Sequence, residues 1–256
     1  MRDDDRTITF QERDFKGSRY RCLLATHMPR PKVLEFLNSL VQPHAAVIND
    51  DFFSPQGFCH PKEPKIEKEP RLLGDDAIRE ALVNWWLADR SGNPTTPNWD
   101  IASRCLVDGK RGILLVEAKA HEDELKHGPA CGAQGKNRDS IEKALAEAAA
   151  ALGTGWSLST AEPHYQMCNR FAWGWKLAQL KIPVVLVYLG FLGAREMDKG
   201  YFGCDAAWQE CLHSHADGCV PPGAWGTTIQ VNGTPFTALI HSADVNMVVD
   251  GAGVMA

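Results

Sequence analysis

The sequence predicts an α/β protein, a three-layer α/β/α sandwich around a mixed central sheet. In residues 99–121 (WDIASRCLVDGKRGILLVEAKAH), two apolar runs flank Asp108-Gly109, a dipeptide typical of tight β-hairpin turns. Residues 182–189 form an apolar run without polar alternation, which is typical of a strand buried on both faces. Predicted helices precede and follow the hairpin, and this order favours helices packed on a mixed sheet.

The composition is ordinary for a globular protein and shows no strong charge bias. Of 256 residues, 44% are hydrophobic and 23% are charged, and the net charge is −5. A nucleic-acid partner would therefore need a local basic patch. The longest apolar run, 182–192, contains a proline and a glycine and is shorter than the roughly 20 residues of a membrane span. The charged N-terminus and scattered cysteines predict a cytoplasmic protein with reduced thiols and no membrane partner.

Residues 1–73 are expected to form an N-terminal elaboration and linker. Residues 7–10 and 20–25 are short β-like runs, and 32–41 carries apolar residues at helical spacing. The proline-rich, charged segment 43–70 predicts a loop. The basic side chains in and just after this segment are Lys62, Lys65, Lys68 and Arg71. Three nearby glutamates offset their charge, which favours a solvated loop over a phosphate-binding surface.

Residues 74–190 are expected to form the core, beginning with a helix over 74–89. Asp75 and Asp76 suit the N-cap and first turn of this helix, where acidic groups are favourable. Apolar residues at helical spacing predict a buried stripe, and Glu80 lies beside it.

The polar stretch after the hairpin, residues 121–139, predicts a long loop. Loops of this length are uncommon unless they are functional, so we expect a lid or a substrate-gripping segment. Strong helix formers at 140–152 predict the next helix. A further helix at 164–181 leads into the buried strand.

Residues 191–256 are expected to form a C-terminal elaboration packed on the core. Residues 203–215 predict a helix, and Asn232-Gly233 between two β-like runs predicts a second hairpin. The glycine-rich tail at 250–256 is expected to fray.

Charged residues interrupt the buried hairpin strand where it ends, in Glu117-Ala118-Lys119. Because strand side chains alternate between faces, Glu117 and Lys119 point the same way. Buried charges are unfavourable unless they are paired. Asp100, near the start of the partner strand, joins them if the hairpin pairs in the expected register. Two carboxylates and a lysine at one point of a sheet indicate a divalent-metal site.

Asp100 followed by Glu117-Ala118-Lys119 resembles the motif of the PD-(D/E)XK nuclease superfamily, which has the restriction-endonuclease-like fold. The resemblance covers residues 74–190 and includes the order of elements: a helix with Glu80, a hairpin, a helix and a buried strand. Asn98-Trp99-Asp100 departs from the Pro-Asp that the family often carries. The resemblance implies a restriction-endonuclease-like core and a metal-dependent nuclease that hydrolyses phosphodiester bonds, with DNA as the expected substrate.

The resemblance also implies roles for the site residues. Asp100, Glu117 and the backbone carbonyl of Ala118 would hold Mg²⁺ or Mn²⁺, because hard cations prefer oxygen ligands. Lys119 would activate the attacking water and stabilise the developing negative charge, and Glu80 would complete the cluster. The expected substrate-binding residues are Gln166, Asn169 and Arg170, which share one helix face, and His121.

Other functions stay open on the sequence alone. A structural ion-pair network among Asp100, Glu117 and Lys119, without a metal, gives the same pattern. The negative net charge and eight tryptophans favour a non-catalytic binding module on the same fold. A metal-dependent hydrolase of a small nucleotide would instead show a narrow pocket closed by residues 121–139.

Two further expectations concern metals and assembly. A soft-metal site would use Cys204, Cys211, His213, His215 and Cys219, although their spacing matches no structural zinc pattern. A homodimer is expected if the protein cuts both strands of a duplex, since nucleases of this fold often pair for that purpose.

Overall fold

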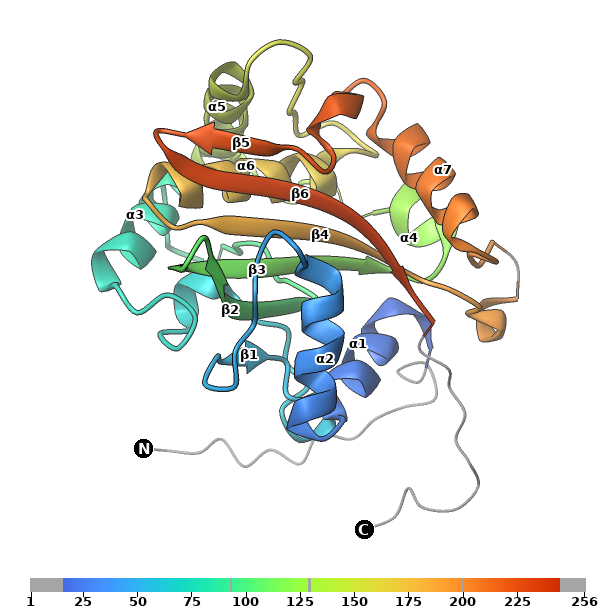
Figure 1. Ribbon diagram of the computed structural model, residues 1–256. Helices are drawn as coiled ribbons and strands as arrows, with labels where there is room; N and C mark the ends of the chain where they lie inside the picture. Colours follow the sequence, from blue (N-terminus) through green and yellow to red (C-terminus); the bar gives the residue numbers. More distant parts are fainter. Residues whose placement is uncertain (1–15, 93, 129, 199, 245–256) are drawn as a thin grey trace.

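A six-stranded mixed sheet in the order β1-β2-β3-β4-β6-β5 runs through the structure (Figure 1). The structure is a computed structural model that describes residues 16–92, 94–128, 130–198 and 200–244. β3, β4 and β6 are mutually parallel, whereas β1, β2 and β5 pair antiparallel with their neighbours. The strands are β1 (Phe53–Ser54), β2 (Ile101–Val107), β3 (Lys110–Lys119), β4 (Val184–Phe191), β5 (Thr228–Val231) and β6 (Thr234–Ala243).

Seven α-helices accompany the sheet in the described part of the chain. They are α1 (Gly17–His27), α2 (Arg30–Val41), α3 (Asp76–Trp86), α4 (Glu122–Lys126), α5 (Gly135–Leu152), α6 (Tyr165–Gln179) and α7 (Asp205–Ala216). None of the helices within these described ranges combines the length and apolar character needed to cross a membrane. The mixed sheet and these helices together make the protein a member of the mixed α/β class.

The central hairpin forms as the turn residues predict. Asp108 and Gly109 have φ angles of 50° and 73°, the left-handed conformation that a two-residue type I′ turn requires at both positions. The turn sets the register, with Val107 opposite Lys110 at one end of the hairpin. The second predicted hairpin is also present, as β5 and β6. The apolar run becomes β4, and every residue of that strand is buried.

Apolar side chains form two core clusters, and alternate residues of β3 belong to different ones. Ile113 and Leu115 belong to the cluster that includes residues of α3, α5 and α6. Leu114 and Val116 belong to the cluster that includes residues of α2. In Figure 1, α2 lies in front of the strands and α6 behind them. The two faces of the sheet are thus covered by different helices.

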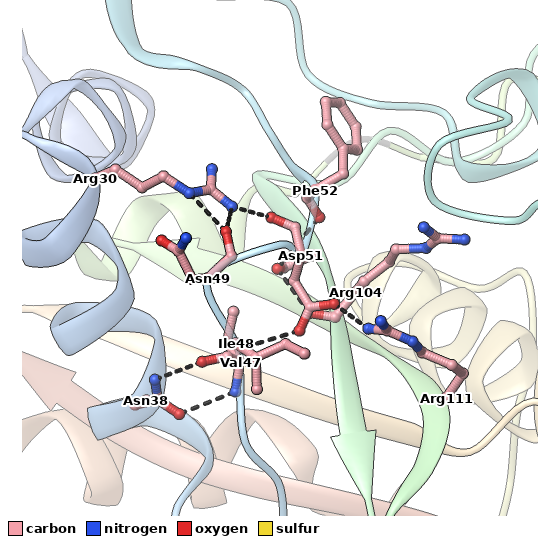
Figure 2. Close-up of polar contacts among 10 residues, drawn as sticks. Arg30, Asn38, Val47, Ile48, Asn49, Asp51, Phe52, Arg104 and Arg111 are labelled. Carbon is pink, nitrogen blue, oxygen red and sulfur yellow. Dashed lines mark hydrogen bonds and ion pairs between the residues drawn. The ribbon is translucent and has the colours of Figure 1, made fainter.

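A buried carboxylate fixes the segment that leads into β1 (Figure 2). The Asp51 side chain is fully buried, accepts a hydrogen bond from the Ile48 backbone N–H at 2.8 Å and pairs with Arg111 of β3. Arg30 donates to the backbone carbonyls of Asn49, at 2.8 Å, and Asp51, at 2.6 Å. These contacts anchor the irregular chain before β1 to β3 and to α2.

Two local predictions are wrong. Residues 20–25 lie in α1, not in a strand, because a short apolar run does not by itself distinguish a helix from a strand. Residues 121–139 are not one loop: α4 occupies part of this stretch, and α5 begins at Gly135. The first turns of α5 are polar because their residues are exposed or half-buried, so they show no apolar periodicity that would predict a helix. The predictions for residues 7–10 and 250–256 lie outside the described residues.

The sheet takes strands from all three predicted segments. β1 precedes residue 74, and it pairs with β2. β6 follows residue 190, and it pairs with β4 over eight residue pairs. The segments at both ends of the chain therefore extend the central sheet.

Candidate functional site

A pocket of about 700 Å³ lies at the carboxyl end of β3. This volume is within the range of about 300–1,000 Å³ that is typical of small-molecule sites. It gathers predicted site residues from the hairpin and from α6. The predicted residues that line it are Asp100, Glu117, Lys119, Gln166, Asn169 and Arg170.

The hairpin register brings Asp100 to this end of β3. Ile101 pairs with Val116, so one further step along the two strands places Asp100 beside Glu117. The Asp100 carboxylate accepts a hydrogen bond from the Ala118 backbone N–H at 2.7 Å. Asp100 is thereby held between the positions of the two β3 charges, as the sequence predicts.

Residues of α6 meet the β3 charges from the other side of the pocket. Gln166 and Arg170 are one helical turn apart and face the same way. The Lys119 ammonium donates to the Gln166 side-chain oxygen at 3.0 Å. The Arg170 Nε donates to Glu117 Oε2 at 2.6 Å.

Glu117 lies between two cations in a nearly dry environment. Its side chain is only 1% exposed, and its second oxygen accepts a hydrogen bond from the Lys119 ammonium. Burial alone would raise the pKa of Glu117, but Arg170 and Lys119 outweigh burial and hold that pKa below its ordinary value. The Arg170 guanidinium also lies 4.5 Å from the Trp99 ring centroid, and it donates to the Asn169 side-chain oxygen at 3.0 Å.

Lys119 is an ammonium in this environment. Burial alone would lower its pKa, but the carboxylates of Glu117 and Asp100 raise that pKa above its ordinary value. Lys119 can therefore donate hydrogen bonds and stabilise negative charge at neutral pH.

Asp100 has the opposite perturbation to Glu117. Burial, followed by the charge of Glu117, raises the pKa of Asp100 well above its ordinary value, although Lys119 partly opposes this shift. Glu63 adds a further repulsion. Burial and the two neighbouring carboxylates thus disfavour the charged form of Asp100 more strongly than Lys119 favours it.

Glu63 is a pocket residue that the sequence does not indicate. It reaches the pocket from the proline-rich segment, and burial followed by the nearby Glu117 charge raises its pKa, although Arg19 partly opposes the shift. Its Oε1 lies 3.8 Å from the Arg19 Nε. Glu63 belongs to an irregular segment without periodicity, so no spacing signal connects it to the motif.

Glu80 and His121 are not brought to the pocket. α3 buries Leu82 and Trp86, which leaves Glu80 exposed and paired with Arg90 at 2.7 Å. β3 ends at Lys119, so the strand alternation does not extend to His121. Instead the His121 Nδ1 caps α4 by accepting a hydrogen bond from the Asp123 N–H at 3.0 Å. The structure therefore gives neither residue the predicted position.

The segment between α4 and α5 forms one wall of the pocket. Ala130, Gly132, Ala133 and Gln134 line it there. This is the part of the predicted 121–139 loop that remains irregular. Whether it contacts a substrate stays a prediction.

The cysteines and histidines near α7 face different surroundings. Cys219 is buried, with its sulfur 3.8 Å from the Met167 sulfur, whereas Cys204 is exposed. The His215 ring packs 5.1 Å from the His164 ring, centroid to centroid. Among the described residues, no group of three or more His, Cys, Asp or Glu side chains is arranged to hold a metal ion.

The donor set of the pocket fits a hard divalent cation. Mg²⁺ is usually held by one or two carboxylates and keeps several waters, so Asp100 and Glu117 would suffice. A carboxylate offers about four lone-pair positions, so the two hydrogen bonds on Glu117 leave room for a metal ligand bond. A cation would also relieve the repulsion that raises the pKa of Asp100.

No family model matches the chain, and no similar curated protein or solved structure was found. The residues of the pocket and their geometry are therefore the basis for assigning a function.

Proposed function

We propose that the protein is a metal-dependent phosphodiesterase of the PD-(D/E)XK type, acting on nucleic acid, with DNA as the expected substrate. The observation that carries the proposal is the meeting of Asp100, Glu117 and Lys119 in one pocket. Their meeting follows from the register of the hairpin, which the turn sets independently of any function.

The order of elements supports a restriction-endonuclease-like core with three α/β/α layers. A helix, α3, precedes the β2–β3 hairpin, and α6 and the buried β4 follow it. β4 pairs parallel with β3. The helix α5 is an addition to this order, and it packs against both α3 and α6 in the same core cluster.

Each side chain of the pocket has a defined task in the proposed reaction. Asp100, Glu117 and the Ala118 carbonyl would hold Mg²⁺ or Mn²⁺. When bound, such a cation polarises the phosphoryl group and makes water more acidic. The Lys119 ammonium, oriented by Gln166, would stabilise the negative charge that develops during attack. Arg170 would orient the phosphate, since guanidinium groups match phosphate geometry.

Cleavage assays with a lysine variant test the proposal. Plasmid and single-stranded DNA are incubated with Mg²⁺ or Mn²⁺ and either the unmodified protein or Lys119→Ala. Loss of one preorganised charge donor typically lowers a rate by about 10²–10³-fold, and we expect a loss of that order. Lys143→Ala is the matched control, since Lys143 is exposed and lies outside the pocket. Equal cleavage by Lys119→Ala and the control would contradict the proposal.

A small nucleotide is a second candidate substrate. The irregular segment between α4 and α5 walls the pocket, and a volume of about 700 Å³ is suited to a single nucleotide. Hydrolysis of nucleoside triphosphates at rates above those for oligonucleotides would favour this candidate.

A non-catalytic ion-pair cluster is the remaining alternative. Both Glu117 oxygens already bind cationic groups, as a purely structural network would require. Titration calorimetry with Mg²⁺ and Mn²⁺ distinguishes the two cases. A metal site gives a heat of binding that is lost in Asp100→Asn, whereas a structural ion-pair cluster gives no heat of binding in either protein.

A further inference from the structure

A second hollow of about 530 Å³ adjoins the pocket and is rich in basic residues. Glu63 lines both hollows, so they meet at this residue. Four cationic side chains line the second hollow, against two acidic ones. The lysines among them, Lys62, Lys65 and Lys68, are called the lysine cluster below.

The acidic residues of the same segment offset the charge of the lysine cluster only in part. Glu67 is buried and accepts a hydrogen bond from Thr96. Glu69 binds Arg71 through two contacts of 2.8 and 2.9 Å. Glu63 lies at the boundary with the pocket, near Arg19. Of the three, Glu67 acts on Lys65 by partly raising its pKa, so the offset of charge that the sequence suggests is incomplete on this surface.

The three ammonium groups have no ion-pair partner within the described residues. Lys62 and Lys68 are exposed, and Lys65 is half-buried. Burial, followed by the charge of Lys68, lowers the pKa of Lys65, although Glu67 partly opposes this shift. The three lysines line the same hollow, where an anion would be stabilised.

Arg71 has a different role. Its guanidinium carbon lies 4.0 Å from the centroid of the Phe52 ring, and Glu69 holds it in place. The guanidinium of Arg71 thus already has an acidic partner and an aromatic ring, and the lysines are the lining cations without an ion pair in the described part of the chain.

We propose that the lysine cluster binds the phosphodiester backbone of a nucleic-acid strand and guides that strand toward Asp100, Glu117 and Lys119. This inference rests on the proposed function, because it assigns the substrate class of the same site. The position of the two hollows on either side of Glu63 favours a polymer over a single nucleotide. A charged track beside a reactive pocket suits a strand that is longer than the pocket itself.

Fluorescence anisotropy with a labelled 20-nucleotide single-stranded DNA tests the assignment. Binding is measured without divalent metal, over a range of salt concentrations, for Lys62→Gln/Lys65→Gln/Lys68→Gln. Each phosphate contact on a single strand contributes about 0.7 to the slope of log affinity against log salt. Loss of three contacts should therefore lower the slope by about 2 and weaken binding at least tenfold.

Matched variants distinguish binding by the lysine cluster from a general effect of positive charge. Lys32→Gln/Lys110→Gln/Lys143→Gln removes the same charge from exposed positions outside both hollows and should bind like the unmodified protein. Lys62→Arg/Lys65→Arg/Lys68→Arg keeps the charge and should keep the slope. An unchanged slope in the cluster-to-Gln variant would overturn the inference. Equally tight, equally salt-dependent binding of polyglutamate would also overturn it, in favour of an acidic protein partner.

A small diester distinguishes this inference from the proposed function. Bis(4-nitrophenyl) phosphate can enter the pocket without reaching the lysine cluster. We expect the cluster-to-Gln variant to hydrolyse it at the unmodified rate, and Lys119→Ala to bind DNA but hydrolyse neither substrate. Loss of DNA binding in the cluster-to-Gln variant, with diester hydrolysis unchanged, supports the proposed role of the lysine cluster. DNA binding that depends on the cluster, with no hydrolysis by any protein, refutes the proposed function alone.

Discussion

Glu117 is buried beside two cations, and such an arrangement is rarely the most stable one. Removing ions from water is strongly unfavourable, and well-packed apolar residues in place of a buried ion pair are often equally or more stable. The ion pairs of Glu117 with Lys119 and Arg170 are therefore poorly explained by stability alone. A site that must present a carboxylate and an ammonium to a ligand explains their presence.

Replacing Asp100 with asparagine should stabilise the metal-free protein at neutral pH. The pKa of Asp100 is raised in the folded state, so the native protein binds more protons than the unfolded chain above about pH 4. Stability consequently falls as pH rises through the folded pKa. Asp100→Asn removes this loss and can still accept the hydrogen bond from Ala118. We expect a gain of about 1 kcal/mol at pH 7, or roughly 2–4 °C in Tm.

Thermal unfolding between pH 4 and pH 8, with a chelator present, measures this effect. The gain should shrink toward pH 4, where Asp100 is protonated in the folded state and about half protonated in the unfolded chain. Asp50→Asn neutralises an exposed carboxylate and should change stability by less than about 0.5 kcal/mol. A gain from Asp100→Asn that does not depend on pH would contradict the explanation.

At the scale of elements, a glycine sets how closely α6 approaches the sheet. A Cβ on Gly174 would lie 2.6 Å from the Phe236 ring, which is only 1% exposed and cannot move aside. Gly174→Ala should therefore lift α6 from β6. Overpacking of this kind costs about 1–3 kcal/mol, which exceeds the gain of about 1 kcal/mol from the higher helix propensity of alanine.

The same change should also lower activity, because Arg170 and Gln166 lie one and two turns before Gly174 on α6. Calorimetry and the cleavage assay measure the two effects together. Phe236→Leu in the Gly174→Ala protein should restore part of both. Gly203→Ala, where a Cβ would meet nothing within 4 Å, should alter neither. Full activity in Gly174→Ala would show that the placement of α6 does not control the site.

The elements differ in how well the sequence predicts them, and the reason is local. The Asp108-Gly109 turn and the alternation of β3 depend on near neighbours, so both the hairpin and the Asp100–Glu117 juxtaposition are predictable. The predicted position of Glu80 is wrong, because lying beside an apolar stripe on a helix does not determine which neighbouring element a side chain faces. Glu63 is missed because tertiary contacts alone set the path of its segment.

At the scale of the whole molecule, the site lies where parallel strands end. β3 and β4 run parallel, and Lys119 pairs with Gly190 near the end of both strands. Ligands of open α/β sheets commonly bind outside the carboxyl ends of such strands. The lysine cluster lies on a protein of net charge −5, so average composition conceals it. The segment before residue 74, which the sequence predicts to be an elaboration and linker, contains both the lysine cluster and Glu63.

Metal binding should stabilise the fold, because the candidate ligands are brought together at the end of the central hairpin only in the folded state. A ligand at one hundred times its Kd adds about 2.7 kcal/mol to the free energy of unfolding, which is roughly 5–10 °C in Tm for a protein of this size. We expect Mg²⁺ or Mn²⁺ to give such a shift at pH 8 and a smaller one at pH 5, where protons compete for Asp100. Asp100→Asn should begin at a higher Tm without metal and gain little from its addition. Sodium chloride at matched ionic strength controls for screening. With metal, the unmodified protein should therefore have the higher Tm of the two. An equal metal-induced shift in both proteins would show that the cation binds elsewhere.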